Sequence, residues 1–594
     1  MRIGCLLILC VLLAGCTQPA AGPAPEPKPK PTAEANAVFT QLVDDYIGGY
    51  LDARPQTGTS LGLHQYDGKL GGFDKKSIDA ELARLKSFDQ QLTDLGIAHL
   101  NKQNAFDFRL LRGSIRREIF GIEEMRDFTR NPITYAGALD VNIYIKRNFA
   151  PLPDRVRSIT AILNQAPKIF AAAHSNLDES LPRPLIETAI DTANGAADFL
   201  EKDLVDALKD VKDAQLMADF NAADKLAVRE LRAYSDWLSN QKMLHANDQY
   251  ALGRQSYIHL LEYGEMITMP PEQLLAIGMR ELTNKQAVFA EAARAIDPTK
   301  KPAEVFEAIE KEHPTEQSLI PDVARDLDTI RQFVIDHHLV TVPSAVRATV
   351  AETPQYLRAT SFASMDTPGP FETKATEAWY YVTPVESNWP AAQKEEWLDA
   401  FNFYTTDIVS IHEAYPGHYI QFLHLNASPA TFPEKIFGSY AFIEGWAHYC
   451  EQMVVDEGFA GAPGGKVDTV RAAKFRLAQT DEALLRICRL CVSIKMHCAG
   501  MTVDEAAKFF QDNCYYGAKP AHDEAMRATF DPEYLYYTVG KLEILKLRED
   551  YHKQEGSGFS LQKFHDELLS HGMPPIRLLR EVMLKDSAIW DQVL

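Results

Sequence analysis

Side chains that can bind a metal or move a proton are concentrated between residues 411 and 451. They lie in two apolar segments, IHEAYPGHYIQFLHL and YAFIEGWAHYCEQ, and are His412, Glu413, His418, Glu444, His448 and Glu451. A His-Glu pair followed by a second histidine one helical turn later is typical of zinc hydrolases, because two imidazoles bind the ion while the glutamate activates a water. The composition of these segments therefore indicates a metal-dependent hydrolase.

The second histidine comes later than in that pattern. On a straight helix His412 and His418 would point about 120° apart and be separated by roughly 9 Å along the axis, which is too far for one ion. Pro416 has no N–H to donate to the carbonyl of His412, and Gly417 accepts backbone conformations that other residues avoid. We therefore predict that the helix breaks between the two histidines and that His418 returns beside His412.

A third ligand is expected from the second segment. Catalytic zinc is commonly held by three protein ligands plus a water, and a carboxylate on a following helix is a frequent third ligand. In EGWAHYCE, Glu444 and His448 lie one turn apart and Glu451 lies two turns on, so all three share one face. We predict Glu444 as the ligand, with His448 and Glu451 orienting the ligands. The alternative is a plain helix end, with core histidines and solvated glutamates.

These two motifs also resemble a known family. HEAYPGH followed by EGWAHYCE resembles the bacterial family catalogued as domain of unknown function 885, which is similar to gluzincin-type zinc peptidases and reads H-E-x-x-P-G-H. The resemblance implies three zinc ligands and a general base: His412, His418 and Glu444 as ligands, and Glu413 as base. Because the histidines are six residues apart, His424 and His448 remain alternatives to His418.

Two later segments extend the resemblance toward substrate binding. Residues 489–497 read RLCVSIKMH where the family reads R-L-V-V-D-T-G-L-H. Arg489 and His497 match and are expected to contact substrate, whereas Ser493 replaces the aspartate, so any role of that carboxylate is absent. The alternative for this segment is a core helix with one solvated arginine.

The segment DPEYLYYTVGKLEILKLR carries tyrosines and a lysine close together. A tyrosine hydroxyl can stabilise the oxyanion beside zinc, and a lysine or arginine can hold a peptide carboxylate. By resemblance to the family's Y-x-x-G pattern, Tyr537 is predicted as the oxyanion donor, and Lys541 or Arg489 as the carboxylate holder of an exopeptidase. Aromatic core packing with a solvated Lys541 is the alternative.

Strand-like character is confined to residues 339–352 and 377–385. In zinc peptidases an edge strand beside the metal helix pairs with the substrate backbone. Residues 379–383, with Tyr381 as the contact, are predicted to serve in this way, and a plain buried strand is the alternative.

The rest of the chain reads as helices that position these residues. Apolar residues recur at intervals of three and four through residues 37–340, and helical segments dominate 341–594 as well. We predict a mainly α fold, in which one large helical body surrounds a deep cleft and a small β-sheet lies near the metal helix. Within this single domain, 37–594, the first part forms a helical wall (37–340) and the second carries the metal site (341–594).

The N-terminus predicts a lipid anchor. Residues 1–15 contain a short apolar run that ends in Leu-Ala-Gly before Cys16, which resembles a bacterial lipobox. Cleavage would leave a lipidated Cys16 on a Pro- and Ala-rich tether, residues 16–36. Thr17, in place of an aspartate, favours the outer membrane, with the protein facing the periplasm. An ordinary secretory signal is the alternative.

Charge and cysteine content narrow the remaining possibilities. The 594 residues carry 61 basic and 82 acidic side chains, a net charge of −21, which argues against nucleic acid as a partner. Five cysteines follow the leader, and an odd number predicts at least one free thiol. Cys488, Cys491, Cys498 and Cys514 allow a four-cysteine zinc site to be drawn, or one disulfide, and spacing does not decide between them.

The sequence thus predicts a zinc-dependent hydrolase of short peptides with one zinc ion, in which Glu413 activates a metal-bound water. Two other functions remain open: a non-catalytic lipoprotein that binds peptides or a partner, and a metal-dependent amidase or esterase acting on a non-peptide substrate.

Overall fold

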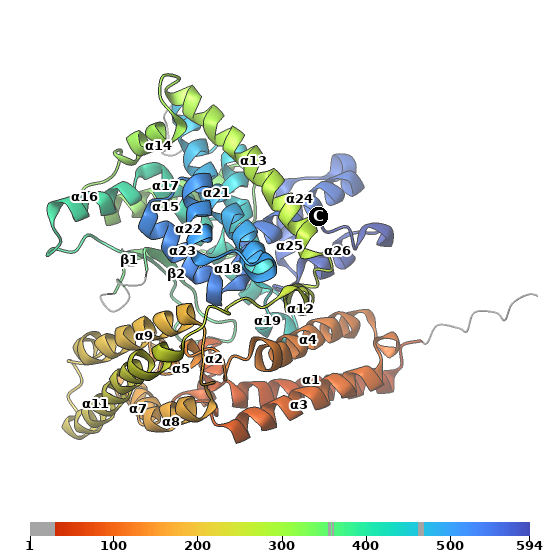
Figure 1. Cartoon of the computed structure of the whole chain (residues 1–594). Helices are drawn as coiled ribbons and strands as arrows, with labels where there is room; N and C mark the ends of the chain where they lie inside the picture. Colours follow the sequence, from red (N-terminus) through yellow and green to blue (C-terminus); the bar gives the residue numbers. More distant parts are fainter. Residues whose placement is uncertain (1–29, 355–357, 359–360, 461–467) are drawn as a thin grey trace, which may run out of the picture.

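The computed structural model describes residues 30–354, 358, 361–460 and 468–594. The described chain is mainly helical with one small sheet, as the sequence predicts. Its N-terminal helices form a lower layer, and the remaining helices form a larger body above it (Figure 1). Cys16 and most of the predicted tether lie outside the described residues.

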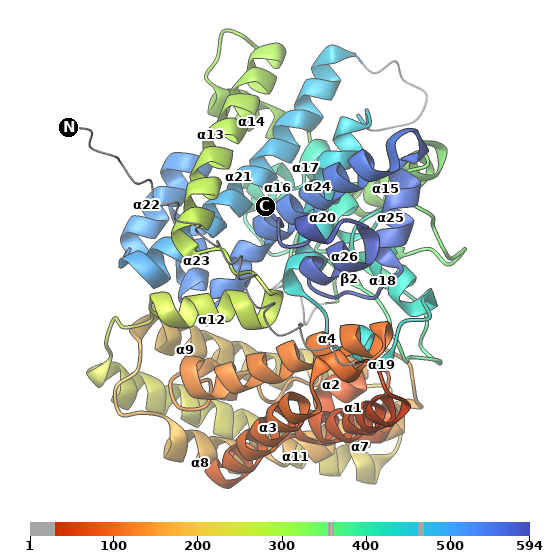
Figure 2. The ribbon, with the colours of Figure 1, turned by 90° about the vertical axis from the view of Figure 1, so that its right-hand side faces the viewer.

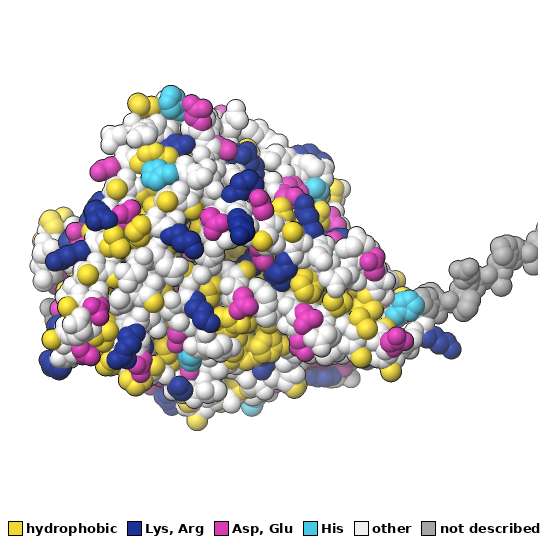
Figure 3. All heavy atoms as spheres, turned by 90° about the horizontal axis from the view of Figure 1, so that it is seen from below, with side chains coloured by type: hydrophobic (Ala, Val, Ile, Leu, Met, Phe, Trp, Pro, Cys, Tyr) yellow, Lys and Arg dark blue, Asp and Glu magenta, His cyan; other side chains and the backbone are white. Residues whose placement is uncertain are grey.

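The lower layer contains two groups of helices, each with its own core. The first group consists of α1 (Ala33–Ala53), α2 (Pro55–Ser60), α3 (Lys75–Leu95) and α4 (Lys102–Phe120). The second consists of α5 (Ile133–Ala136), α6 (Ile143–Lys146), α7 (Leu152–Leu163), α8 (Ala166–Asn176), α9 (Arg183–Asp198), α10 (Val205–Ala207) and α11 (Ala214–Trp237). Seen from below, this layer presents hydrophobic side chains interspersed with acidic and basic ones (Figure 3).

The upper body begins after α12 (Arg254–Glu265), which lies between the two layers (Figure 2). Its first helices, through the end of the HEAYPGH segment, are α13 (Pro271–Ile296), α14 (Pro302–Glu310), α15 (Leu319–Asp336), α16 (Ala391–Ala400), α17 (Phe403–Glu413) and α18 (His418–Ala427). The later ones are α19 (Phe432–Ile436), α20 (Tyr440–Asp456), α21 (Thr469–Ala499), α22 (Val503–Cys514), α23 (Ala518–Phe530), α24 (Tyr536–Glu555), α25 (Leu561–Leu569) and α26 (Ile576–Met583).

The long helix α21 runs through the centre of this body and is buried along most of its length. Helix α13 packs along α21, and α20 packs along α24. Helices α13 and α15 contribute to the same hydrophobic core as α17, α20 and α21, although the sequence analysis assigned residues 271–340 to the wall. In packing terms, these residues belong with the helices of the metal motif.

Local sequence signals explain where several of these helices begin and end. Pro271 occupies the first turn of α13, where its missing N–H costs no hydrogen bond. Thr502 and Glu505 form the predicted capping box of α22. Helix α21 ends at Gly500, whose positive φ of 74° is the left-handed conformation that favours glycine at this position.

The sheet has three strands in the order β1-β3-β2: β1 (Thr349–Glu352), β2 (Ala363–Asp366) and β3 (Trp379–Val382). β1 pairs parallel to β3, and β2 pairs antiparallel to it. β3 is therefore the central strand, with both edges already hydrogen-bonded, so residues 379–383 do not offer the free edge that the sequence analysis predicted. Tyr381 pairs with Ser364 and is buried in the middle of the sheet.

Two glycines set the distance between α20 and α24. A Cβ on Gly540 would lie 1.7 Å from the carbonyl oxygen of Ala441, and one on Gly445 would lie 2.5 Å from the carbonyl carbon of Gly540. Real side chains do not tolerate such contacts, so only glycine allows this close helix crossing. The crossing brings Tyr537 of α24 to the same cavity that the metal motif of α17 borders.

Candidate metal centre

The predicted break between the two histidines is present. Helix α17 ends and α18 begins at His418, and a Cβ on Gly417 would lie 1.8 Å from the carbonyl oxygen of His412. The indole Nε1 of Trp446 donates to the carbonyl oxygens of Pro416, at 3.0 Å, and Gly417, at 3.3 Å. This turn places the rings of His412 and His418 with their centroids 4.8 Å apart.

Glu444 completes a group of three possible ligands with these histidines. Its Oε2 lies 3.4 Å from the Nε2 of His412 and 3.4 Å from the Nε2 of His418. The ligand atoms of all three residues lie within 4.8 Å of one another. The buried Oε2 has no hydrogen-bond partner among the described residues. Two imidazoles and an unsatisfied buried carboxylate oxygen fit a zinc ion.

The two alternative histidines face elsewhere. The Nε2 of His424 lies 2.8 Å from the carbonyl oxygen of Thr341 on the outer side of α18. The Nδ1 of His448 lies 2.9 Å from Glu451, and its Nε2 lies 3.5 Å from the Nζ of Lys541. Neither belongs to the group of three, so His418 is the histidine that the fold brings beside His412.

Glu451 is the buried carboxylate that orients this group. Its Oε1 lies 2.7 Å from the Nδ1 of His412, while its other oxygen meets His448. Arg486 lies 3.6 Å from Oε1 and balances part of the charge. A carboxylate on Nδ1 fixes the tautomer of an imidazole, so Nε2 of His412 is left to face Glu444 and His418.

The electrostatics of the group favour a cation between the carboxylates. Burial alone would lower the pKa of His412, but the nearby carboxylates of Glu444 and Glu451 raise it to about 10. Burial also opposes the ionisation of Glu444 and Glu451. The neighbouring histidines nevertheless hold the pKa of the Glu444 carboxyl below its usual range. Arg486, together with the neighbouring histidines, does the same for the pKa of Glu451. The carboxylates therefore stabilise the protonated form of His412. The same negative charge would stabilise a bound divalent cation.

The predicted base, Glu413, lies at the end of α17 and borders the cavity. Its Oε2 accepts a hydrogen bond of 3.1 Å from the backbone N–H of Met365, which belongs to edge strand β2. Strand β2 therefore lies beside the metal motif in the position that was predicted for residues 379–383.

Tyr537 is the member of the tyrosine cluster that borders the cavity. Its ring lies 6.3 Å from that of His412, at an interplanar angle of 20°. Tyr536 is buried and its hydroxyl donates to the carbonyl oxygen of Leu260 at 3.2 Å, while Tyr534 is fully buried. The structure therefore singles out the tyrosine that precedes the close-packed Gly540 by one turn.

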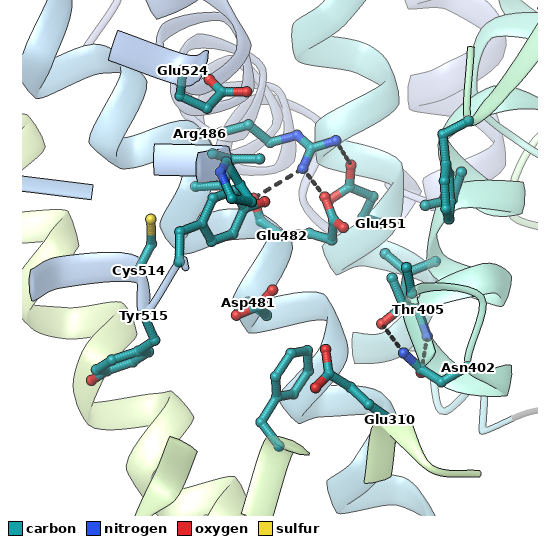
Figure 4. Close-up of a pocket in the computed structure, with 18 of the residues that line it drawn as sticks. Glu310, Asn402, Thr405, Glu451, Asp481, Glu482, Arg486, Cys514, Tyr515 and Glu524 are labelled. Carbon is teal, nitrogen blue, oxygen red and sulfur yellow. Dashed lines mark hydrogen bonds and ion pairs between the residues drawn. The ribbon is translucent and has the colours of Figure 1, made fainter. Parts of the chain in front are cut away.

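The cavity has a volume of about 920 Å³ and extends from the metal motif toward α14 (Figure 4). His412, Glu413 and Tyr537 lie on its wall, together with side chains from α13, α14, α21 and the loop after α22. This volume fits a short peptide segment rather than a folded protein.

Three predicted substrate contacts do not lie free on this wall. His497 is buried, with Nδ1 accepting from the N–H of Leu252 at 3.2 Å and Nε2 at 2.8 Å from the carbonyl oxygen of Ala528. Lys541 is 3% exposed and does not border the cavity. Arg489 does border it, but Nε and NH2 bind the two oxygens of Glu524 at 2.8 and 2.7 Å.

Sequence reasoning missed Arg486, Met365 and the acidic side chains Asp481 and Glu310 on the cavity wall. Arg486 lies one turn before Arg489 on α21, so helical spacing is the signal that could have identified it. The contribution of Met365 is a backbone N–H, which no residue type reveals.

The cysteines form neither of the arrangements considered from spacing. Cys450, Cys488, Cys491, Cys498 and Cys514 are all free thiols in the described part of the chain. None belongs to a possible metal-binding group found among the described residues. No disulfide and no four-cysteine site is therefore present in this region.

Comparisons with known proteins place this arrangement in a family context. A family model described as a bacterial protein of unknown function (DUF885) matches residues 55–583. No protein with a curated description matches the chain. Among the described residues, no helix combines the length and apolar character needed to cross a membrane.

Two solved structures share the fold. One is described as a "putative lipoprotein of unknown function" from Shewanella oneidensis, with 25% identity and a TM-score of 0.76, over 92% of this chain and 100% of that one. The other, a "putative lipoprotein" from Colwellia psychrerythraea, has 17% identity and a TM-score of 0.75, over 93% of this chain and 99% of that one. Both likenesses extend over nearly the whole chain.

Proposed function

The chain belongs to the family described as bacterial protein of unknown function (DUF885), and we propose that it is a zinc-dependent hydrolase of short peptides, similar to gluzincin-type peptidases. The observation that carries this proposal is the convergence of His412, His418 and Glu444 on one point, beside the cavity that His412 and Glu413 border. The unsatisfied Oε2 of Glu444 supports it, because a buried carboxylate oxygen normally has a partner.

The residues of the site have separate roles in this proposal. His412, His418 and Glu444 would hold the zinc, which would supply a Lewis acid for the water and the scissile carbonyl. Glu413, held by the N–H of Met365, takes a proton from the attacking water and returns it to the leaving amine. Tyr537 donates a hydrogen bond to the developing oxyanion.

Metal analysis of the full-length chain tests the first part of the proposal. We expect about one zinc per chain in the wild type, and its loss in His412→Ala and Glu444→Ala. Glu291→Gln, an exposed carboxylate variant on α13, is the matched control and should keep its zinc. If the wild type binds no zinc even when zinc is supplied, the metal site does not exist and a binding function becomes the better explanation.

Peptide turnover tests the second part. Glu413→Gln should retain zinc and lose hydrolysis, whereas Tyr537→Phe should lower kcat by about 10² to 10³ with zinc content unchanged. A panel of short peptides, simple esters and amidated sugars separates peptidase from other amide or ester chemistry. Zinc binding without turnover of any of these substrates would refute the proposed hydrolase activity.

The same proposal includes a lipid anchor. The two neighbours described as putative lipoproteins and the lipobox-like sequence before Cys16 support attachment through Cys16. Thr17 after the cysteine supports the outer membrane, where the hydrolase would face the periplasm.

A further inference from the structure

The wall of the cavity carries more acidic than basic side chains. Its carboxylates are Glu307, Glu310, Glu413, Glu451, Asp481, Glu482 and Glu524, and its guanidinium groups are Arg486, Arg489 and Arg527. An excess of negative charge in a partly enclosed cavity attracts cations and repels anions, because field lines concentrate where solvent is excluded.

The three arginines offset only part of the charge of the seven carboxylates, and each is already engaged by a carboxylate. The pairs are Arg486 with Glu482, Arg489 with Glu524, and Arg527 with Asp531. The Arg489 pair is bidentate, which leaves little of its charge for a ligand. A peptide carboxylate would therefore find no unpaired guanidinium on this wall within the described structure.

Three of the carboxylates lack any such partner among the described residues: the exposed Glu307, and the less exposed Asp481 and Glu310. Asp481 of α21 and Glu310 of α14 form no hydrogen bond or ion pair with the residues that the structure describes, although Asp481 is only 9% exposed. Both point into the cavity (Figure 4). A buried carboxylate without a partner is costly unless a ligand supplies the missing charge.

Burial and neighbouring carboxylates oppose the ionisation of these two groups. Burial, together with neighbouring carboxylates, raises the pKa of Glu310 to about 7 and that of Asp481 well above its usual range. A cation that entered the cavity would reverse these shifts by favouring the ionised forms.

Aromatic side chains border the same end of the cavity. Tyr515, Phe289 and Phe306 line it, and the rings of Phe289 and Tyr515 stack with centroids 5.3 Å apart. Carboxylates beside aromatic faces form a common environment for organic cations. A metal ion is a poorer occupant, because within the described parts of the chain Asp481 and Glu310 belong to no group of three ligand atoms close enough to share one.

We propose that this acidic wall, defined by Asp481 and Glu310, binds a cationic group of the substrate, a protonated amine or a guanidinium. The inference rests on the proposed peptidase function and names its substrate class: peptides that carry a positive charge at their amino terminus or on a lysine or arginine side chain. It replaces the expectation that the site holds a peptide carboxylate through Arg489 or Lys541.

Calorimetric binding to the full-length Glu413→Gln variant tests the wall without requiring turnover. The probes are alanine pentapeptides with lysine, methionine or glutamate placed at each position in turn, with free or acetylated amino termini. We expect a positively charged peptide to bind about 10- to 100-fold more tightly than its methionine counterpart. Acetylation shows whether the amino terminus or the side chain supplies the cation.

Variants of the wall assign the preference to its residues. Adding Asp481→Asn or Glu310→Gln should reduce the charge preference toward one, whereas adding Glu291→Gln should leave it unchanged. Asn and Gln keep the shape while removing an unpaired charge, so we expect these variants to fold. A charge preference that is absent, or that survives both substitutions, overturns the inference.

Hydrolysis of the same peptides by the wild type separates this inference from the proposed function. Cleavage without regard to charge would refute the acidic wall and leave the peptidase standing. Charge-dependent binding without cleavage would refute the peptidase and leave the wall standing. If the peptides are neither bound nor cleaved, both proposals fail.

Discussion

At the scale of single residues, Glu451 is the side chain on which the proposed metal site most depends after the ligands. It is fully buried and its two oxygens meet the Nδ1 atoms of His412 and His448. The side-chain amide of Glu451→Gln has only one oxygen, so one of the two imidazoles would face an N–H group in its place. The pair of carboxylate contacts that fixes the orientation of His412 is then lost. We expect zinc affinity to fall about 10- to 100-fold, measured by competition with a chelator of known affinity.

The control for this experiment is Glu291→Gln, which changes an exposed carboxylate in the same chemical way. Unchanged zinc affinity in Glu451→Gln, with the fold intact by circular dichroism, would mean that Glu451 serves the core and not the metal.

Lys541 makes the stability of the protein depend on pH. Burial and the nearby charge of Lys285 lower the pKa of Lys541 to about 7, against an ordinary value of 10.5. The unfolded chain therefore binds more protons between pH 7 and 10.5, so this group destabilises the fold fully below pH 7 and progressively less as pH rises. Lys541→Met should raise the free energy of unfolding more at pH 6 than at pH 9, by about 2 kcal/mol in urea titrations.

A gain that is equal at both pH values would instead come from the added apolar surface of methionine. That result would show that Lys541 is ionised in the folded protein at pH 9 as well as at pH 6.

The sequence was informative about residue types at the site and uninformative about their partners. The HEAYPGH segment contains its own break, so the meeting of His412 and His418 was predictable from Pro416 and Gly417. Arg489 was expected to hold a carboxylate, but its partner Glu524 lies on another helix, and only the fold brings the two together. The unpaired Asp481 was unpredictable for the same reason.

At the scale of elements, the crossing of α20 and α24 is the contact that brings Tyr537 into the cavity. Gly540→Ala would place a methyl group 1.7 Å from the carbonyl oxygen of Ala441, so the helices must separate. We expect a loss of about 1 to 3 kcal/mol in the free energy of unfolding, measured by urea denaturation. The proposed zinc ligand Glu444 lies on α20, so zinc affinity should fall as well.

Gly195 supplies the matched control for this substitution. It lies inside α9, and an added Cβ would have no neighbour within 4 Å. Gly195→Ala should therefore stabilise the protein by about 0.5 to 1 kcal/mol through helix propensity. If both substitutions shift stability in the same direction, the close crossing of α20 and α24 is not what Gly540 provides.

Helices were predictable from the sequence and the sheet was predictable only in part. Periodic apolar residues, Pro271 and the Thr502 capping box each act locally, and the structure contains the corresponding helices. Strand β2 reads Ala-Ser-Met-Asp, which lacks β-branched and aromatic residues, so its sequence carries no strand signal. Because β2 pairs with β3, β3 is the central strand, and the edge beside Glu413 belongs to β2.

At the scale of the whole molecule, the mainly helical body with a cavity was predictable from composition and periodicity, whereas the grouping of its helices was not. α13 and α15 join the core of the metal motif through contacts with helices far along the chain, such as α21. Sequence periodicity identifies an apolar face but not the helix that covers it.

The proposed lipid anchor belongs to the scale of the whole chain, because it concerns where the proposed hydrolase works rather than how. Cys16 lies outside the described residues, which begin at residue 30, and the proposed site lies wholly in the upper body.

The substitution Cys16→Ser tests the anchor in two ways. Cys16→Ser should move the protein from the membrane fraction to the soluble fraction and abolish palmitate labelling, since an acylated cysteine supplies the membrane affinity. Its kcat/KM on soluble peptides should stay within about twofold of the wild type, because the residues that line the cavity lie between positions 289 and 537, far along the chain from Cys16. Membrane association that persists in Cys16→Ser would place the attachment elsewhere in the chain, and a large loss of activity on soluble peptides would show that the anchor also supports the fold.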